Sequence, residues 1–128
     1  MKTRYEITAF VKNKFGLIIS VGLNSYIKSH PLQKFFAEKV GKPHNIYLHA
    51  EILALIRASI SKEIGDTLQV QRYNTIGHPE DAKPCPICVE AAIFFGIKKI
   101  NYTTKNGWVY GKTPQELKDE YSKSKQND

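Results

Sequence analysis

Apolar and polar positions alternate at the beginning of the chain. Residues 5–11 place apolar side chains at about every second position, which is typical of a strand with one buried face, and the more apolar run 17–24 predicts a second, more buried strand. The polar stretch 12–16 between them predicts a turn, so the two strands should form a hairpin. A third alternating run, residues 67–74, predicts another strand further along the chain.

Between the second and third predicted strands, the apolar period changes from two residues to three or four. Residues 31–40 and 49–60 therefore predict two helices. Ser29 is a candidate cap for the first of them, and Gly41 is a candidate terminator. Residues 88–96 predict a third helix, which ends at a glycine.

The last part of the chain predicts two short strands and a helix. Residues 97–104 and 108–111 read as strands that flank Asn106-Gly107, a dipeptide typical of tight hairpin turns. We therefore expect these strands to pair antiparallel. Residues 113–123 predict a C-terminal helix, which opens with a Thr-x-x-Glu capping box.

The order of these elements predicts an α/β fold with a mixed sheet of about five strands and helices packed on it. The 128 residues fit a single domain, with a core at about 4–112 followed by the C-terminal helix. No apolar run reaches about 18 residues, the length that spans a membrane. The N-terminus lacks the apolar stretch of a signal peptide, so we expect a cytoplasmic protein.

The formal net charge of the chain is +7. A basic surface favours anionic partners, which include nucleotides and nucleic acid. The positive charge is spread along the chain without a basic stripe, however, and solubility alone is an equally good explanation of it.

The only two cysteines of the sequence, Cys85 and Cys88, stand about one helical turn apart. Such a pair indicates a metal or redox site rather than a structural disulfide. His49, at the start of a predicted helix, is a candidate third ligand. Three protein ligands and an open position are typical of catalytic zinc, whereas a structural site normally has a fourth ligand. Three further histidines could supply that fourth ligand: His30, His44 and His78.

Glu51 stands two residues after His49 and is a poor candidate for the same metal. A carboxylate beside a zinc-activated water can accept a proton from it and deliver that proton to the substrate. Taken alone, however, Glu51 is an ordinary acidic residue in the first turn of a helix.

The two motifs together are more specific than either one alone. His-Ala-Glu at 49–51 and Pro-Cys-Pro-Ile-Cys at 84–88 match the H-x-E…P-C-x-x-C signature of zinc nucleobase deaminases. Over roughly residues 5–108, the sequence resembles the cytidine deaminase superfamily. It resembles the branch with histidine in the first motif, as in deoxycytidylate deaminases and tRNA adenosine deaminases.

The resemblance implies a three-layer cytidine deaminase-like sandwich with Glu51 as the proton shuttle. It implies that a Zn²⁺ ion is bound by three side chains: His49, Cys85 and Cys88. It also implies that Asn24, at the end of the second predicted strand, contacts the base. By the same resemblance, the backbone amide of Ala50 contacts the base as well.

The sequence departs from the family pattern at both ends. Family members usually begin with a helix, whereas only about four residues precede the first predicted strand here. The C-terminal helix or a partner subunit would then have to cover one face of the sheet. The tight hairpin predicted near Asn106 is closer to the nucleoside branch and to some deaminase toxins than to the histidine-type branch.

These observations predict hydrolytic deamination of cytosine in a free (deoxy)cytidine nucleoside or nucleotide such as dCMP. By resemblance, enzymes acting on free nucleotides are usually homo-oligomers. One alternative is a deaminase of cytosine or adenine in single-stranded nucleic acid or tRNA. Others are an inactive zinc-containing module that binds nucleic acid, and a redox dithiol, which leaves Glu51 unexplained. Five residues in the loops flanking the site could also contact substrate: Tyr26, Lys28, His30, His44 and His78.

Overall fold

The computed structural model describes residues 7–61 and 63–126, which form a mixed sheet and four helices. The strands are β1 (Ile7–Lys12), β2 (Ile18–Leu23), β3 (Thr67–Arg72), β4 (Lys99–Thr104) and β5 (Gly107–Lys112). The helices are α1 (Pro31–Lys39), α2 (Ala50–Ile60), α3 (Pro86–Phe94) and α4 (Pro114–Gln126). All nine predicted elements are present in the predicted order, although the first two residues of the first predicted strand lie outside the described part of the chain.

The five strands are arranged in the order β2-β1-β3-β4-β5. Strands β3 and β4 run parallel, and the other neighbouring pairs are antiparallel. The predicted antiparallel pairing of the last two strands is therefore confirmed. The parallel pair requires a crossover, which α3 provides between β3 and β4.

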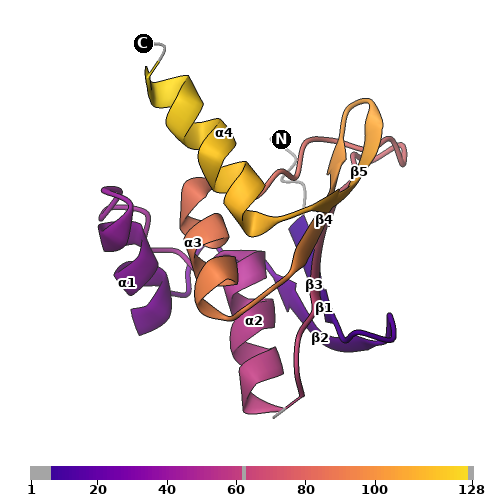
Figure 1. The fold of residues 1–128 in the computed structure, drawn as a ribbon, viewed down its shortest axis with the longest axis horizontal. Coiled ribbons are helices and arrows are strands. Elements are labelled where there is room, and N and C mark those ends of the chain that lie inside the picture. The colour runs from indigo at the N-terminus through magenta and orange to yellow at the C-terminus, as the bar shows by residue number, and fades with distance from the viewer. Residues whose placement is uncertain (1–6, 62, 127–128) are drawn as a thin grey trace.

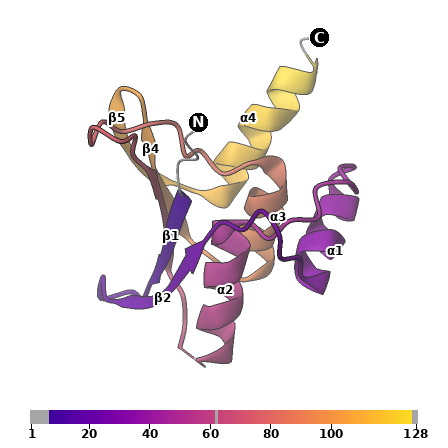
Figure 2. The ribbon, with the colours of Figure 1, turned by 180° about the vertical axis from the view of Figure 1, so that it is seen from behind.

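All four helices lie on the same face of the sheet (Figures 1 and 2). Helix α2 packs on β1 and β2, and α3 lies between α1 and α4. The C-terminal helix does not cover the second face of the sheet, because it packs against α3 instead. No helix of the described residues lies on that second face, so the expected third layer is not seen among them.

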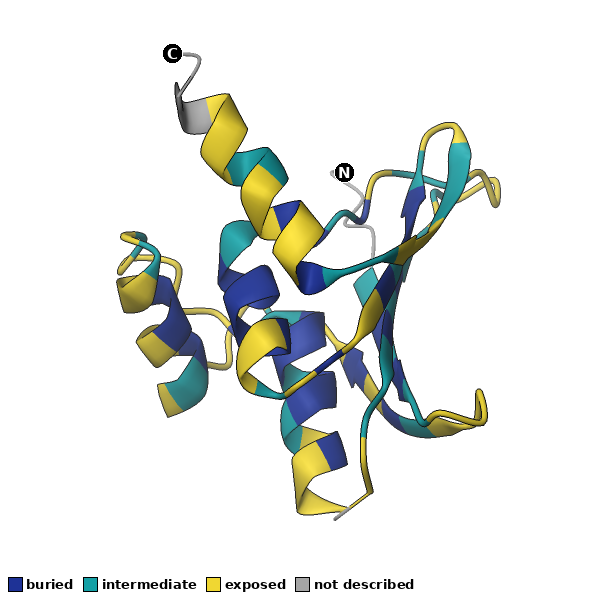
Figure 3. Cartoon of the chain, viewed as in Figure 1, coloured by how far each residue is buried: buried dark blue, intermediate teal, exposed yellow. Residues whose placement is uncertain are grey.

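The core lies between the sheet and the helices (Figure 3). Alternate residues of the central strands point toward the helices and have no exposed surface: Ala9, Val11, Leu68 and Val70. On the opposite face of the edge strand β2, Val21 and Leu23 stay partly exposed. None of the helices in the described ranges has both the length and the apolar character needed to cross a bilayer.

A glycine allows β2 to approach the first turn of α2 closely. A Cβ atom on Gly22 would collide with the backbone carbonyl oxygen of Ala50 and would lie 2.7 Å from the backbone nitrogen of Ala54. Two residues earlier, the Ser20 hydroxyl donates a hydrogen bond to the Ala54 carbonyl at 2.7 Å. The contact between strand and helix is thus made backbone to backbone, which fixes where α2 begins.

The ends of two helices show one wrong prediction and one that is confirmed. The cap of α1 is His30 rather than Ser29, because the His30 Nδ1 atom accepts a hydrogen bond from the Leu32 backbone N–H at 3.1 Å. The capping box of α4 is present as predicted. The Thr113 hydroxyl accepts from the Glu116 N–H at 3.0 Å, and the Glu116 carboxylate accepts from the Thr113 N–H at 3.2 Å.

The β4–β5 hairpin turns one residue earlier than the Asn106-Gly107 dipeptide indicates. Thr104 pairs with Gly107, so the two turn residues are Lys105 and Asn106. The Thr104 hydroxyl accepts from the Asn106 N–H at 3.1 Å and donates to the Gly107 carbonyl at 2.9 Å. These two bonds stabilise the observed register. Gly107 is the first strand residue and has a φ of +111°, which disfavours a side chain.

Candidate active site

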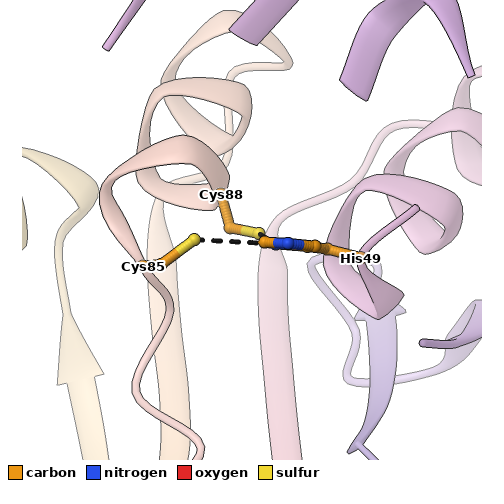
Figure 4. Close-up of side chains that lie close together, drawn as sticks. All are labelled: His49, Cys85 and Cys88. Atoms are coloured by element: carbon orange, nitrogen blue, oxygen red, sulfur yellow. Dashed lines mark hydrogen bonds between the residues drawn. The ribbon is translucent and has the colours of Figure 1, made fainter. Parts of the chain in front are cut away.

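Three potential metal ligands meet where α2 and α3 begin (Figure 4). His49 is the N-cap of α2, Cys85 is the N-cap of α3, and Cys88 lies in the first turn of α3. Neither cap side chain bonds to the backbone of its own helix, so both are available to the shared site. The potential ligand atoms of the three residues all lie within 4.8 Å of one another.

The separations between these atoms fit a zinc ion. The His49 Nδ1 atom lies 3.2 Å from the Cys88 Sγ atom and 3.6 Å from the Cys85 Sγ atom. Tetrahedral zinc, with bonds of about 2.3 Å to sulfur and about 2.0 Å to nitrogen, would place such donors about 3.5 Å apart. None of the other three histidines joins this group in the described part of the chain. The donor set therefore leaves a fourth position open, as catalytic zinc sites do.

The electrostatics of the donor group favour a cation. The hydrogen bond with the Cys88 thiol, helped by His49, lowers the pKa of Cys85 to about 4 despite burial. Burial raises the pKa of the Cys88 thiol. Burial by itself would lower the pKa of His49, but the hydrogen bond and charge of Cys85 outweigh it and raise that pKa. A divalent cation would therefore meet one ready thiolate and would displace the protons of the other two donors.

Glu51 lies beside this group but does not belong to it. It is in the first turn of α2, with only 6% of its surface exposed. Burial, reinforced by the negative charge of Cys85, raises the pKa of the Glu51 carboxyl. A carboxyl group with a raised pKa can both accept and return a proton near neutral pH, which is the property required of a general acid–base.

The donor group opens into a pocket of about 390 Å³. Its walls include His49, Glu51 and Cys85, so a molecule bound in the pocket would lie next to the donor group and the Glu51 carboxyl. Asn24 and Ala50, the two residues expected to contact the base, also line it. All six residues singled out from the sequence thus lie in or directly beneath one cavity, with Cys88 fully buried below it.

The Asn24 side chain is held in place by the neighbouring strand. The Asn24 Oδ1 atom accepts a hydrogen bond from the Ile7 backbone N–H at 2.9 Å, and the Asn24 backbone N–H donates to the Ile7 carbonyl at 3.3 Å. Asn24 lines the pocket, and its Nδ2 group is a hydrogen-bond donor. Ala50 is the first residue of α2, where backbone N–H groups have no partner within the helix. Both residues can therefore donate to a ligand.

The start of α2 is tied to α1 by one buried side chain. The Gln33 Oε1 atom accepts a hydrogen bond from the His49 backbone N–H at 3.1 Å. The Gln33 Nε2 group donates to the Asn45 carbonyl at 3.1 Å. The Gln33 side chain has no exposed surface, and it joins the half-buried His49 to the exposed Asn45. The sequence offered no signal for this role, since Gln33 looks like an ordinary residue of a surface helix.

The rim of the pocket is formed by loops that the sequence could only partly assign. Of the five flanking residues considered, Tyr26 and His44 line the pocket, whereas the other three do not. The three residues outside the lining are Lys28, His30 and His78, and His30 instead caps α1. Five further polar or aromatic residues of the pocket lining were not singled out from the sequence: Ser25, Asn45, Tyr47, Asp81 and Lys83. Tyr47 reaches the rim because an isolated bridge pairs it with Ser29.

Comparisons with known proteins agree with this geometry. The family model described as the cytidine and deoxycytidylate deaminase zinc-binding region matches residues 2–104 of the chain. Among curated proteins, no sequence matches. The matched range contains both motifs and every residue of the donor group. The chain therefore belongs to the family of cytidine and deoxycytidylate deaminase zinc-binding domains.

Proposed function

We propose that the protein catalyses the hydrolytic deamination of a cytosine base, in a free (deoxy)cytidine nucleoside or nucleotide such as dCMP. The observation that carries this proposal is the buried Glu51 carboxyl beside a three-donor group that opens into a pocket. A structural metal site would have no use for an open position or for an adjacent carboxyl group of raised pKa.

In this proposal, zinc is held by His49, Cys85 and Cys88. When bound, it supplies an activated water molecule for attack on C4 of the base. Glu51 accepts a proton from the attacking water and passes it to N3 of the ring. It then transfers the second proton to the leaving amine. The net reaction converts cytosine and water into uracil and ammonia, and Glu51 returns to its initial state.

The same pocket provides hydrogen-bond donors for the base. Asn24 and Ala50 both line the cavity, and their proposed donors are the Asn24 Nδ2 group and the Ala50 backbone N–H. Cytosine presents a carbonyl oxygen at C2, which requires donors rather than acceptors. We infer that these two groups orient the base so that C4 points toward the metal and Glu51.

A single nucleotide is the substrate that best matches the cavity. Its volume of about 390 Å³ lies at the small-molecule end of ligand pockets. One observation favours the alternative, a base presented in single-stranded nucleic acid. Tyr26 and Tyr47 at the rim are 46% and 50% exposed, and half-exposed aromatic side chains offer stacking surfaces for neighbouring bases.

Ammonia release from a substrate panel tests the proposal. The panel contains cytidine, deoxycytidine, their monophosphates, a single-stranded oligonucleotide and adenosine substrates. We expect turnover of at least one free cytosine compound, with weak dependence on salt. A preference for the oligonucleotide with a steep salt dependence would support the nucleic-acid alternative instead. No release from any substrate by the zinc-loaded protein would contradict deamination and favour an inactive module.

A further inference from the structure

The C-terminal helix lies outside the range that the family model matches, yet it contacts Lys83 and Pro84, the two residues before Cys85. The match ends at residue 104, whereas α4 begins at Pro114. We propose that Tyr121 of α4 is a positioning residue, which holds the backbone before Cys85 so that its thiolate faces His49 and Cys88. This inference rests on the zinc site of the proposed function.

The link consists of one short hydrogen bond. The Tyr121 hydroxyl donates to the Pro84 carbonyl oxygen at 2.6 Å. Pro84 is buried, and its carbonyl belongs to the peptide bond that leads directly into Cys85. A buried carbonyl requires a donor. Among the described residues, Tyr121 provides the only hydrogen bond recorded for Pro84.

Helix α4 is attached on both sides of this bond, which fixes the direction of Tyr121. On one side, the Lys118 ammonium lies 2.9 Å from the carboxylate of Glu90, a buried residue of α3. On the other side, the Lys83 ammonium lies 3.1 Å from Glu120 and 4.9 Å above the Tyr121 ring. The helix therefore contacts the loop residue before Pro84 as well as the helix that follows it.

The neighbouring backbone offers little substitute for the Tyr121 bond. Before Pro84, the loop is fixed by the Ala82 N–H, which donates to the Thr103 carbonyl at 2.9 Å, and by a longer bond from the Lys83 N–H to the Asp81 Oδ1 atom at 3.3 Å. After it, the next fixed point is the first helical bond of α3, from the Val89 N–H to the Cys85 carbonyl at 3.0 Å. Loss of the Tyr121 hydroxyl would therefore free the peptide that places the Cys85 thiolate, while the core on both sides stays intact.

The test uses the full chain with Tyr121→Phe, which keeps the ring and removes only the donor. Zinc release to a colorimetric chelator is measured below the melting temperature, together with the visible absorption of the cobalt(II)-loaded protein. We expect release to accelerate about tenfold, the lower end of effects seen for groups that orient metal ligands. We also expect a shift of the cobalt bands, because they report the geometry of the thiolate ligands.

Two control variants separate positioning from stability. Lys118→Met removes the ion pair between α4 and α3 but leaves the bond to Pro84 in place. Leu117→Val removes a methylene group from a fully buried side chain of α4. Both should leave the cobalt spectrum and the release rate near wild type, even where the melting temperature falls. If release follows melting temperature alike in all three variants, Tyr121 is merely structural and the proposal is overturned.

The remaining outcomes are equally decisive. Unchanged zinc release and an unchanged cobalt spectrum in folded Tyr121→Phe would overturn the role of Tyr121 alone. A wild-type chain that binds no zinc would instead overturn the proposed function. If Tyr121→Phe does not fold, Tyr121→Met decides, because it also removes the donor to the Pro84 carbonyl and leaves an apolar side chain in its place. A smaller acceleration of release supports the proposal, and no acceleration overturns it.

Discussion

The two helix starts that bring the metal donors together are held in different ways. The start of α2 is pressed against β2 at Gly22 and is bonded to Gln33, both within the range that the family model matches. The start of α3 is bonded to Tyr121 of α4, which lies beyond that range. Both starts adjoin the core, but the α3 start receives a hydrogen bond from a helix beyond the matched range.

The difference in burial indicates how each helix start should respond to change. Gln33 has no exposed surface and makes two hydrogen bonds, so its substitution removes both of them at once. The contacts of α4 are more open, since the side chains of Lys83 and Glu120 are 28% and 41% exposed. Exposed ion pairs contribute little to stability because water and salt screen them. We therefore expect damage at α2 to reduce stability strongly, and damage at α3 to change metal geometry more than stability.

Removal of a metal donor should have the largest effect on zinc binding, and the effect should be the same at the start of α2 and at the start of α3. Either His49→Ala or Cys88→Ala leaves two protein ligands, too few for a stable zinc site. We expect zinc content to fall from about one ion per chain to near zero, with turnover lost, as measured by elemental analysis and ammonia release. Full zinc occupancy in either variant would show that the metal is held elsewhere.

A methyl group at Gly22 should separate α2 from the sheet. The new Cβ would meet backbone atoms of Ala50 and Ala54, which cannot move aside as a flexible side chain can. Overpacking of this kind destabilises proteins by about 1–3 kcal/mol. Urea unfolding of Gly22→Ala should show that loss, and turnover should fall because Glu51 is displaced. Val21→Ala, on the opposite face of the same strand, is the control and should change both much less.

Gln33→Leu compares the two helix starts directly. It leaves the His49 N–H and the Asn45 carbonyl without their hydrogen-bond partner. His49 is half-buried, so its unpaired N–H costs about 1–3 kcal/mol, whereas Asn45 is exposed and its carbonyl can bond to water instead. In urea unfolding of the metal-free protein, Gln33→Leu should therefore lose clearly more stability than Tyr121→Phe. Gln33→Leu removes two hydrogen bonds and Tyr121→Phe removes one, so equal losses of stability would contradict this comparison.

The smallest expected effect is a dependence on pH at the α4 side. Burial would raise the pKa of Glu120, but its bonds and charge pairing with Lys83 and Lys112 outweigh burial and lower that pKa. A carboxylate with a lowered pKa stabilises the fold above the ordinary value of 4.5 and loses this effect as pH falls through the folded-state pKa. Wild type should thus exceed Glu120→Gln in stability at neutral pH by at most about 1 kcal/mol. The difference should vanish in acid, and a difference that grows in acid would contradict this sign.

The features predicted correctly from the sequence are mostly local ones. His49 and Glu51 stand two residues apart, and Cys85 and Cys88 three, so short motifs suffice to identify them. The helices and strands were found because their apolar periods are local too. The contacts of Gln33 and Tyr121 were not predictable, since each depends on how a whole helix packs against a distant loop. The cap of α1 was misplaced because His30 can accept a hydrogen bond as well as Ser29 can.

Turnover by zinc-loaded Glu51→Gln tests the central claim most directly. The substitution keeps the size of the side chain and the three metal donors but removes the group that exchanges protons. Wild type and variant are compared at equal zinc content, by ammonia release from the best cytosine substrate. We expect the variant to fold, to keep about one zinc ion and to lose about 10²–10⁴-fold in turnover. Turnover close to that of wild type would contradict the account, because the reaction would then not depend on Glu51.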